Sequence, residues 1–316
     1  MKKVFVIILA FGLAISMVNF TSSAYAAKWY VPGDFATIQN AIDDASVNDG
    51  DTIMVGPGLF AGALVDKSVE IKGVGGATIN DGPPHSSGLI QGFRLLAGSD
   101  GCTISHLRFI EPVVLTIMNA AAVDDVTVTQ NTLINQIQGI SDWAGNRWEI
   151  SHNEIIDLHT RCGGGIGILV GTFFTSQVAN ENVVSHNKIY GTLVVPAGDC
   201  GGYNGTGIVI FNDRRFGSSG DYILDNRVVK NNISLVADNQ GSINSVDVVA
   251  IELTDTGEVV GVISDNAIGF NDLRGTANQI VLTPPGLDNP VNDISRNLGN
   301  NRGHGLHPSL FGPGGN

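Results

Sequence analysis

The stretch Ile150-Ser151-His152-Asn153-Glu154-Ile155 decides the fold, because close copies of it return along the chain. The asparagines of successive copies lie 22 to 40 residues apart, a spacing typical of a solenoid in which each repeat forms one coil. The copies are Val128–Leu133, Val184–Ile189, Leu224–Val228, Ile263–Ile268 and Ile294–Leu298, while Ile104–Phe109 lacks the asparagine.

A second, more apolar motif lies between copies of the first. Alternation along it directs Ile166, Ile168 and Val170 toward one side, which predicts an inward row stacked at about 4.8 Å per coil. Three short strands per coil indicate a three-sided parallel β-helix, an all-β solenoid. The second motif occurs at Gln138–Ile140, Gly165–Val170, Gly205–Ile210, Val249–Leu253 and Gln279–Leu282.

The repeated asparagine has a structural explanation. A sharp turn between two strands favours a left-handed backbone, which asparagine tolerates better than most residues. Stacked asparagine side chains can also hydrogen-bond to one another along the solenoid. We therefore predict that these residues form the corners of the coils.

The two ends of the chain differ from its middle. Residues 1–26 combine Lys2 and Lys3 with an apolar run and a small-residue Ala24-Tyr25-Ala26 site, which predicts a secretory signal peptide. Residues 27–316 then form one β-helix domain without a membrane span, with a capping helix over 34–46 that begins at Asp34. The glycine-rich tail, 299–316, offers no recognisable cap.

The charge of the chain excludes some partners. The leader holds two of the 17 basic residues and no acidic ones, which leaves 15 basic against 30 acidic residues and a net charge of −15. So acidic a chain disfavours nucleic acid and anionic membranes. It also disfavours polyuronates unless a bound cation reverses the local field.

With the repeats, the cap, the Gly50–Ile53 entry and the Ile71–Gly76 turn, nearly the whole mature chain resembles the pectate-lyase-like parallel β-helix superfamily. The resemblance implies a right-handed solenoid, but it does not choose a chemistry, because the superfamily contains lyases, hydrolases, epimerases and noncatalytic surface proteins. The predicted signal peptide indicates a secreted protein, either extracellular or at the cell surface, with the periplasm as a further possibility.

Two of the three cysteines occupy matching places in successive coils. Cys162 and Cys200 each precede a strand of the second motif, so stacking brings them within disulfide range. Secretion permits the bond. We predict a Cys162–Cys200 disulfide, and a buried, unpaired Cys102.

A catalytic set can come only from the loops. His159 and Arg161 alternate along one side of an extended segment, and Asp199 falls in the next coil. One interpretation is a base and cation site for an acidic sugar. The other is an Arg161–Asp199 surface ion pair beside the disulfide.

Further residues are candidates for substrate binding. Asp213 with Arg214 can grip a carboxylate, or the loop can be an ordinary solvated turn. The loop aromatics can stack on sugar rings or instead cover the apolar strand face. The candidates are Trp143, Phe173, Phe174, Asp213, Arg214, Arg215, Tyr203 and Glu252.

Specific enzyme signatures are missing, as are zinc spacings and calcium-binding loops. No cofactor is evident in the sequence, and calcium binding is possible. Two functions remain open: a secreted protein that binds and in one version cleaves an extracellular polysaccharide, or a noncatalytic surface scaffold. The sequence leaves enzymatic activity and oligomeric state undecided.

Overall fold

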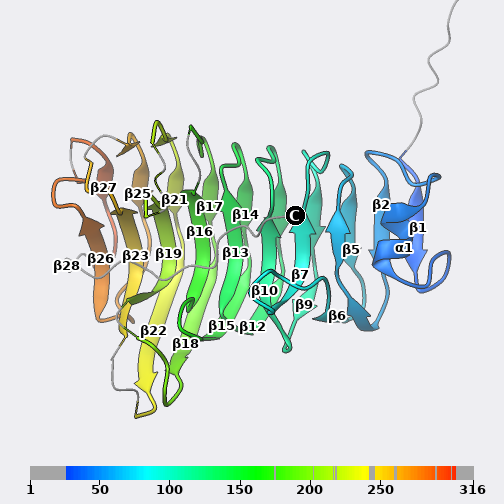
Figure 1. Cartoon of the computed structure of the whole chain (residues 1–316), viewed down its shortest axis with the longest axis horizontal. Helices are drawn as coiled ribbons and strands as arrows, with labels where there is room; N and C mark the ends of the chain where they lie inside the picture. Colours follow the sequence, from blue (N-terminus) through cyan, green and yellow to red (C-terminus); the bar gives the residue numbers. More distant parts are fainter. Residues whose placement is uncertain are drawn as a thin grey trace, which may run out of the picture.

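The computed structural model describes residues 26–303 except 174–175, 202, 216, 218, 242–245, 260–261, 289 and 300. The expected leader and most of the glycine-rich tail lie outside these residues. In the described part, the chain winds through three parallel sheets whose coils stack side by side along the long axis (Figure 1). The structure is therefore a three-sided parallel β-helix, as the repeats predicted.

We name the sheets A, B and C in the order in which one coil visits them. Sheet A has ten strands in the described residues: β1 (Lys28–Val31), β2 (Thr52–Val55), β5 (Glu70–Gly73), β8 (Thr103–Ser105), β11 (Thr127–Thr129), β14 (Glu149–Ser151), β17 (Val183–Ser185), β21 (Arg227–Val229), β25 (Ala267–Gly269) and β27 (Asp293–Ser295).

Sheet B has seven strands in the same residues: β3 (Gly58–Ala61), β6 (Ala77–Asp81), β9 (Arg108–Phe109), β12 (Thr132–Gln136), β15 (Glu154–His159), β18 (Lys188–Val195) and β22 (Asn232–Asn239). Sheet C has nine: β4 (Ala63–Val65), β7 (Ile90–Leu95), β10 (Val113–Asn119), β13 (Gln138–Trp143), β16 (Ile166–Thr172), β19 (Asn204–Asn212), β23 (Asp247–Asp255), β26 (Asn278–Thr283) and β28 (Arg302–Gly303). A short pair, β20 (Ile223–Leu224) and β24 (Ile263–Ser264), lies outside these sheets.

The core is built from rows of aliphatic residues that stack from coil to coil. In sheet A the central residue of each short strand points inward and is buried, and each such side chain contributes about 1.5–3 kcal/mol through the hydrophobic effect. This row is Ile53, Ile71, Ile104, Val128, Ile150, Val184, Val228, Ile268 and Ile294. In sheet C the matching row includes Ile140, Ile168, Ile208, Ile251 and Ile280.

The capping helix is shorter than predicted. Helix α1 spans Ile38–Asp43 and lies at the β1 end of the solenoid (Figure 1). Its N-cap is Thr37, whose side chain accepts from the Asn40 amide, whereas Asp34 accepts a hydrogen bond from the Tyr30 amide. Ile38, Ala41 and Ile42 are buried as the periodicity required, but Ala45 lies beyond the helix and is exposed.

The corner between sheets A and B is an asparagine ladder. The amide nitrogen and side-chain nitrogen of Asn153 both donate to Asn187 Oδ1, at 3.0 and 3.1 Å. The other rungs repeat this pattern and each side-chain nitrogen also donates to a backbone carbonyl of the preceding coil, so buried peptide groups at the turn are satisfied. The ladder is Asn131, Asn153, Asn187, Asn231, Asn271 and Asn297.

Two of the predicted copies belong to a different corner. Asn226 and Asn266 form a second ladder with Asn182 and Asn292, at the turn that leads into sheet A. Where both ladders are present, a rung of each lies at either end of a short strand of sheet A. Strand β21, for example, lies between Asn226 and Asn231. The true copies of the first motif are therefore Val228–Asn231 and Ile268–Asn271, which pair with Val184 and Val228 in register.

The left-handed residue is also one position earlier than predicted. In the first ladder, the residue before each asparagine has φ near +60°: Gln130, His152, His186, Lys230, Phe270 and Arg296 precede the six rungs. His106 has the same conformation before Leu107, in the coil that lacks the asparagine. The asparagine itself supplies the side-chain hydrogen bonds. Backbone conformation and capping are thus divided between two neighbouring residues.

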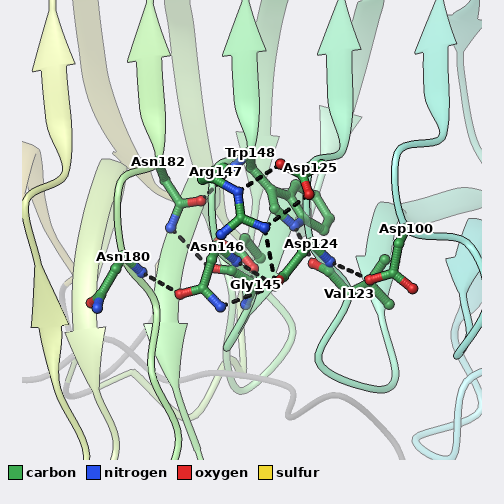
Figure 2. A network of polar contacts seen from close by, with 11 residues as sticks. Asp100, Val123, Asp124, Asp125, Gly145, Asn146, Arg147, Trp148, Asn180 and Asn182 are labelled. Carbon is green, nitrogen blue, oxygen red and sulfur yellow. Dashed lines mark hydrogen bonds and ion pairs between the residues drawn. The ribbon is translucent and has the colours of Figure 1, made fainter.

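A polar network supports the corner that leads into sheet A (Figure 2). Asn146 accepts from the Asn180 amide and donates to Asp124, which continues the stacking from coil to coil. Arg147 makes two hydrogen bonds to Asp125, at 2.7 and 2.8 Å, and one to Asp124 at 3.2 Å. These charged side chains hold neighbouring turns together on the surface.

Candidate functional site

A hollow that includes two of the predicted site residues, His159 and Arg161, lies where sheet B passes into sheet C. This cavity, of about 310 Å³, is called here the His159 pocket. Its apolar wall comes from buried Leu89, Val114 and Ile137, and its polar rim from Glu111, His159 and Arg161. Gly88, Ile90 and Pro112 complete the lining. The volume and the mixture of apolar wall and polar rim are those of a small-molecule site.

His159 is held by the coils beneath it. It ends β15, and its Nδ1 lies 3.2 Å from Asn135 Oδ1, while Asn135 Nδ2 donates to Glu111 Oε1 at 2.6 Å. Burial lowers the pKa of His159, against the opposing effects of the Glu111 charge and the Asn135 contact. The imidazole is therefore neutral at pH 7 and can accept a hydrogen bond or a proton.

Arg161 is the free cation of the pocket. The residue is exposed, and no carboxylate within the described residues lies close enough to form an ion pair with it. The predicted Arg161–Asp199 ion pair is therefore wrong. A guanidinium without an internal partner is suited to bind a carboxylate, sulfate or phosphate group.

Asp199 does not line the pocket, although the sequence grouped it with His159 and Arg161. It is buried and accepts four hydrogen bonds of 2.7–2.8 Å, from Thr160 Oγ1, Tyr203 Oη and the Cys162 and Gly201 amides. Burial raises its pKa, but the four hydrogen bonds together outweigh burial and hold the pKa below its usual value. Asp199 thus fastens the turns around the disulfide, and Tyr203, whose pKa is raised by burial, is part of the same structure.

The predicted disulfide is present. Cys162 and Cys200 are bonded, with their Cα atoms 4.6 Å apart, and they join successive coils directly behind Arg161. Cys102 is buried and unpaired, as expected.

The basic loop after β19 is neutralised by the chain itself. Arg215 makes a bidentate pair with buried Asp213, at 2.9 and 2.8 Å. Arg214 lies 3.2 Å from Asp255, a fully buried carboxylate in the next coil. Because Arg214 and Arg215 already have carboxylate partners within the protein, this loop is poorly suited to bind a carboxylate group of a substrate.

The aromatic residues cover the strand face. Trp143 is buried, and its ring meets Phe173 edge to face at 5.5 Å. Both lie against an apolar cluster on the outward side of sheet C, formed by Met118, Ile166, Leu169, Val209 and Phe211. Ile168 and Val170 belong to the inner core as predicted, but the inward position predicted for Ile166 is wrong. Trp143 is therefore unavailable for stacking on a sugar, and Phe174 lies outside the described residues.

Glu252 is buried on the same outward side. It accepts hydrogen bonds from Asn204, Thr206 and Thr254, at 3.1, 3.0 and 2.7 Å. Glu252 does not line any of the pockets found in the described residues, so it is not part of an exposed carboxylate pair there. It stabilises strands β19 and β23 and offers no open contact to a substrate.

Sequence reasoning identified His159 and Arg161 and missed the other residues that line the His159 pocket. Glu111 and Pro112 occupy a turn between β9 and β10, and Gly88 and Leu89 end the loop before β7. These segments carry neither repeat motif, so nothing in the periodicity marked them. Among the described residues, no three His, Cys, Asp or Glu side chains gather as metal ligands, and no helix is long and apolar enough to cross a bilayer.

Comparison with known proteins gives one relative. The chain is 30% identical over 152 residues, 45% of its length, to a cell surface glycoprotein of Methanothermus fervidus. The match spans only 22% of that protein. No family model matches the chain, and no solved structure matches it. The parallel β-helix is present, but no comparison confirms the pectate-lyase-like superfamily, and the chain is similar to part of a cell surface glycoprotein.

Proposed function

We propose that this protein is a noncatalytic component of the cell surface that binds an extracellular polysaccharide through the His159 pocket. The observation that carries the proposal is the separation of the predicted catalytic set. Asp199 is fully engaged in the turns behind the pocket, so Arg161 and His159 form a binding rim without it. Similarity to a cell surface glycoprotein and a disulfide suited to an oxidising compartment support the location.

The pocket has a place for each part of a sugar residue. The apolar face of a ring fits against Leu89, Val114 and Ile137. Ring hydroxyls can donate to Glu111 and to neutral His159, and Arg161 can bind one acidic substituent. Because the chain is strongly acidic overall, a polysaccharide with few acidic groups fits better than a polyuronate.

A second candidate function rests on the same pocket. His159 is a neutral base beside an unpaired arginine, an arrangement that can abstract a proton next to a sugar carboxylate bound by Arg161. Hydrolysis has less support, because it requires two carboxylates and Glu111 is the one that lines the described pocket. The alternative enzyme is therefore a lyase.

One experiment separates these functions. The mature protein is incubated with neutral and uronate-containing polysaccharides, with and without calcium, while binding, unsaturated ends and reducing ends are measured. We expect binding without product, and at least a roughly tenfold loss of affinity in Arg161→Ala, as for the loss of a charge-assisted hydrogen bond. Arg274→Ala, which removes an exposed arginine paired with Asp272, is the matched control and should bind normally.

Each other result has a clear meaning. Unsaturated ends that disappear in His159→Gln would establish the lyase in place of the noncatalytic protein. Absence of binding across the panel would overturn the polysaccharide partner. Binding that Arg161→Ala leaves unchanged would remove the His159 pocket from the proposal.

A further inference from the structure

Three Asn-x-Ser/Thr triplets occur in the sequence, which is the acceptor pattern for asparagine-linked glycans. They begin at Asn19, Asn204 and Asn232. Asn19 falls within the expected leader. The structure separates the other two, because a glycan can be carried only where the side chain reaches solvent.

Asn204 is committed to the interior. The residue is fully buried at the start of β19, and its Nδ2 donates to Glu252 Oε1 at 3.1 Å. The following Gly205 is equally confined, since a Cβ there would meet the Leu193 side chain at 2.1 Å. A sugar on Asn204 would have to displace this packing.

Asn232 has the opposite environment. It begins β22, the terminal strand of sheet B, and its backbone amide donates to Asn187 O at 2.9 Å. Asn232 and Ser234 are both exposed, while Ile233 between them points inward and is buried. The carboxamide of Asn232 makes no hydrogen bond to any residue that the structure describes, so both parts of the acceptor triplet face solvent together.

The surface around Asn232 has an apolar character that a glycan would cover. Val236, on the same face of β22, is 58% exposed. Asn232 bridges to Asp272, which bridges to Leu298, so Leu298 lies two coils away, at about 10 Å, and is 54% exposed. Phe270, beside Asp272 in sequence, is 55% exposed.

The start of β22 is not an open sheet edge, because the Ile233 amide donates to Asp272 O at 2.9 Å and the Leu235 amide donates to Thr276 Oγ1 at 3.0 Å. A glycan on Asn232 would therefore leave the backbone pairing intact. A hydrophilic polymer attached there would screen the neighbouring exposed apolar residues. The triplet therefore lies where attachment is sterically open and physically useful.

We propose that Asn232 carries an asparagine-linked glycan. In the transfer, a bond forms between Asn232 Nδ2 and the anomeric carbon of an oligosaccharide. The bond between that carbon and the phosphate of a lipid-linked oligosaccharide donor breaks, and Nδ2 loses one proton. This inference rests on the proposed surface location, because the donor is met during export.

The test is glycopeptide mass spectrometry of the full-length protein secreted by its own organism. We expect the peptide containing Asn232 to carry a sugar mass and the peptide containing Asn204 to be unmodified. Asn232→Gln and Ser234→Ala should each abolish the sugar mass, and Ser234→Thr should retain it. The Ser234 variants separate recognition of the triplet from damage to the strand, because Asn232 remains in both.

The same spectra report the Cys162–Cys200 bond. An unmodified Asn232 in a disulfide-bonded protein would overturn the glycan and leave the surface location intact. An unmodified Asn232 in a protein with reduced cysteines would overturn the glycan and count against the location as well. A sugar found on Asn204 in place of Asn232 would contradict the structural reasoning directly.

Discussion

Glu252 shows how strongly one residue depends on its surroundings. Burial raises the pKa of its carboxyl group to about 7, although hydrogen bonds from Thr254, Thr206 and Asn204 act in the opposite direction. Because those three donors also favour a fixed side-chain position, Glu252 ties β19 to β23 in either protonation state. Its sequence position on the outward face of sheet C suggested a substrate contact, and only its burial removes that role.

The raised pKa predicts a specific pH dependence of stability. Between the ordinary value of 4.5 and about 7 the folded protein binds a proton that the unfolded chain releases. The stabilisation is therefore complete below about pH 4.5 and is lost as pH rises to about 7, by at most roughly 1.4 kcal/mol per pH unit.

Urea unfolding of wild type and Glu252→Gln at pH 5, 6, 7 and 8 measures this effect. The difference in unfolding free energy between the two proteins should change between pH 5 and 7 and level off by pH 8. Taking this difference cancels other groups, including buried Asp142, whose pKa burial also raises. Glu181→Gln, an exposed control, should follow wild type, and a Glu252→Gln profile parallel to wild type would contradict the prediction.

At the scale of elements, sheet C depends on a row of glycines. A Cβ on Gly139, Gly167 or Gly207 would meet the carbonyl oxygen of the next coil at 2.4, 2.5 and 2.7 Å. These glycines precede the isoleucines that made the second motif recognisable. The Gly-Ile pattern of the second motif therefore reflects the close approach of neighbouring coil backbones, which only a residue without a side chain permits.

Gly167→Ala should destabilise the protein by about 1–3 kcal/mol, the usual cost of forcing an extra methyl group into a filled site. The new methyl group would press on both Gly207 O and the Ile189 side chain, so neither neighbour can give way alone. Chemical denaturation measures the loss. Gly56→Ala, whose nearest contact would be 3.4 Å, is the control and should change stability much less. Equal effects in the two variants would show that close approach does not limit this row.

For the molecule as a whole, the disulfide is a covalent link between coils that otherwise meet by stacking. Cys162 and Cys200 are 38 residues apart in sequence, so the bond restricts a long loop of the unfolded chain. In the loop-entropy treatment such a bond stabilises by about 3–4 kcal/mol. Both residues are exposed and therefore open to reductants.

A reducing agent should lower the unfolding free energy of wild type by about that amount and leave Cys162→Ala/Cys200→Ala unaffected. Cys102→Ala, which keeps the bond, should still respond to the reductant. Thermal or urea unfolding with and without reductant gives the comparison. If the reductant left the unfolding free energy of wild type unchanged, coil stacking alone would be enough to hold these two coils together.

Local sequence was enough to predict the solenoid, its three short strands per coil, the cysteine pair and the inward rows except at Ile166, which lies in the outward cluster of sheet C. These follow from local periodicity, since a β-helix places residues of successive repeats directly above one another. The corner assignment did not follow, because two asparagine ladders flank strands β17, β21, β25 and β27 of sheet A, and Asn226 resembles Asn231 in its local sequence. Only backbone pairing distinguishes them.

The tertiary structure alone decided the candidate site. The His159 pocket combines a turn at Glu111, a loop ending at Leu89 and the end of β15, which share no motif and meet because four successive coils stack. The same stacking places Asp199 where it accepts a hydrogen bond from the Cys162 amide, and it buries Trp143 and Glu252. Periodic sequence specifies which residues stack, whereas burial and hydrogen-bond partners arise from loops of unequal length that only the folded chain brings together.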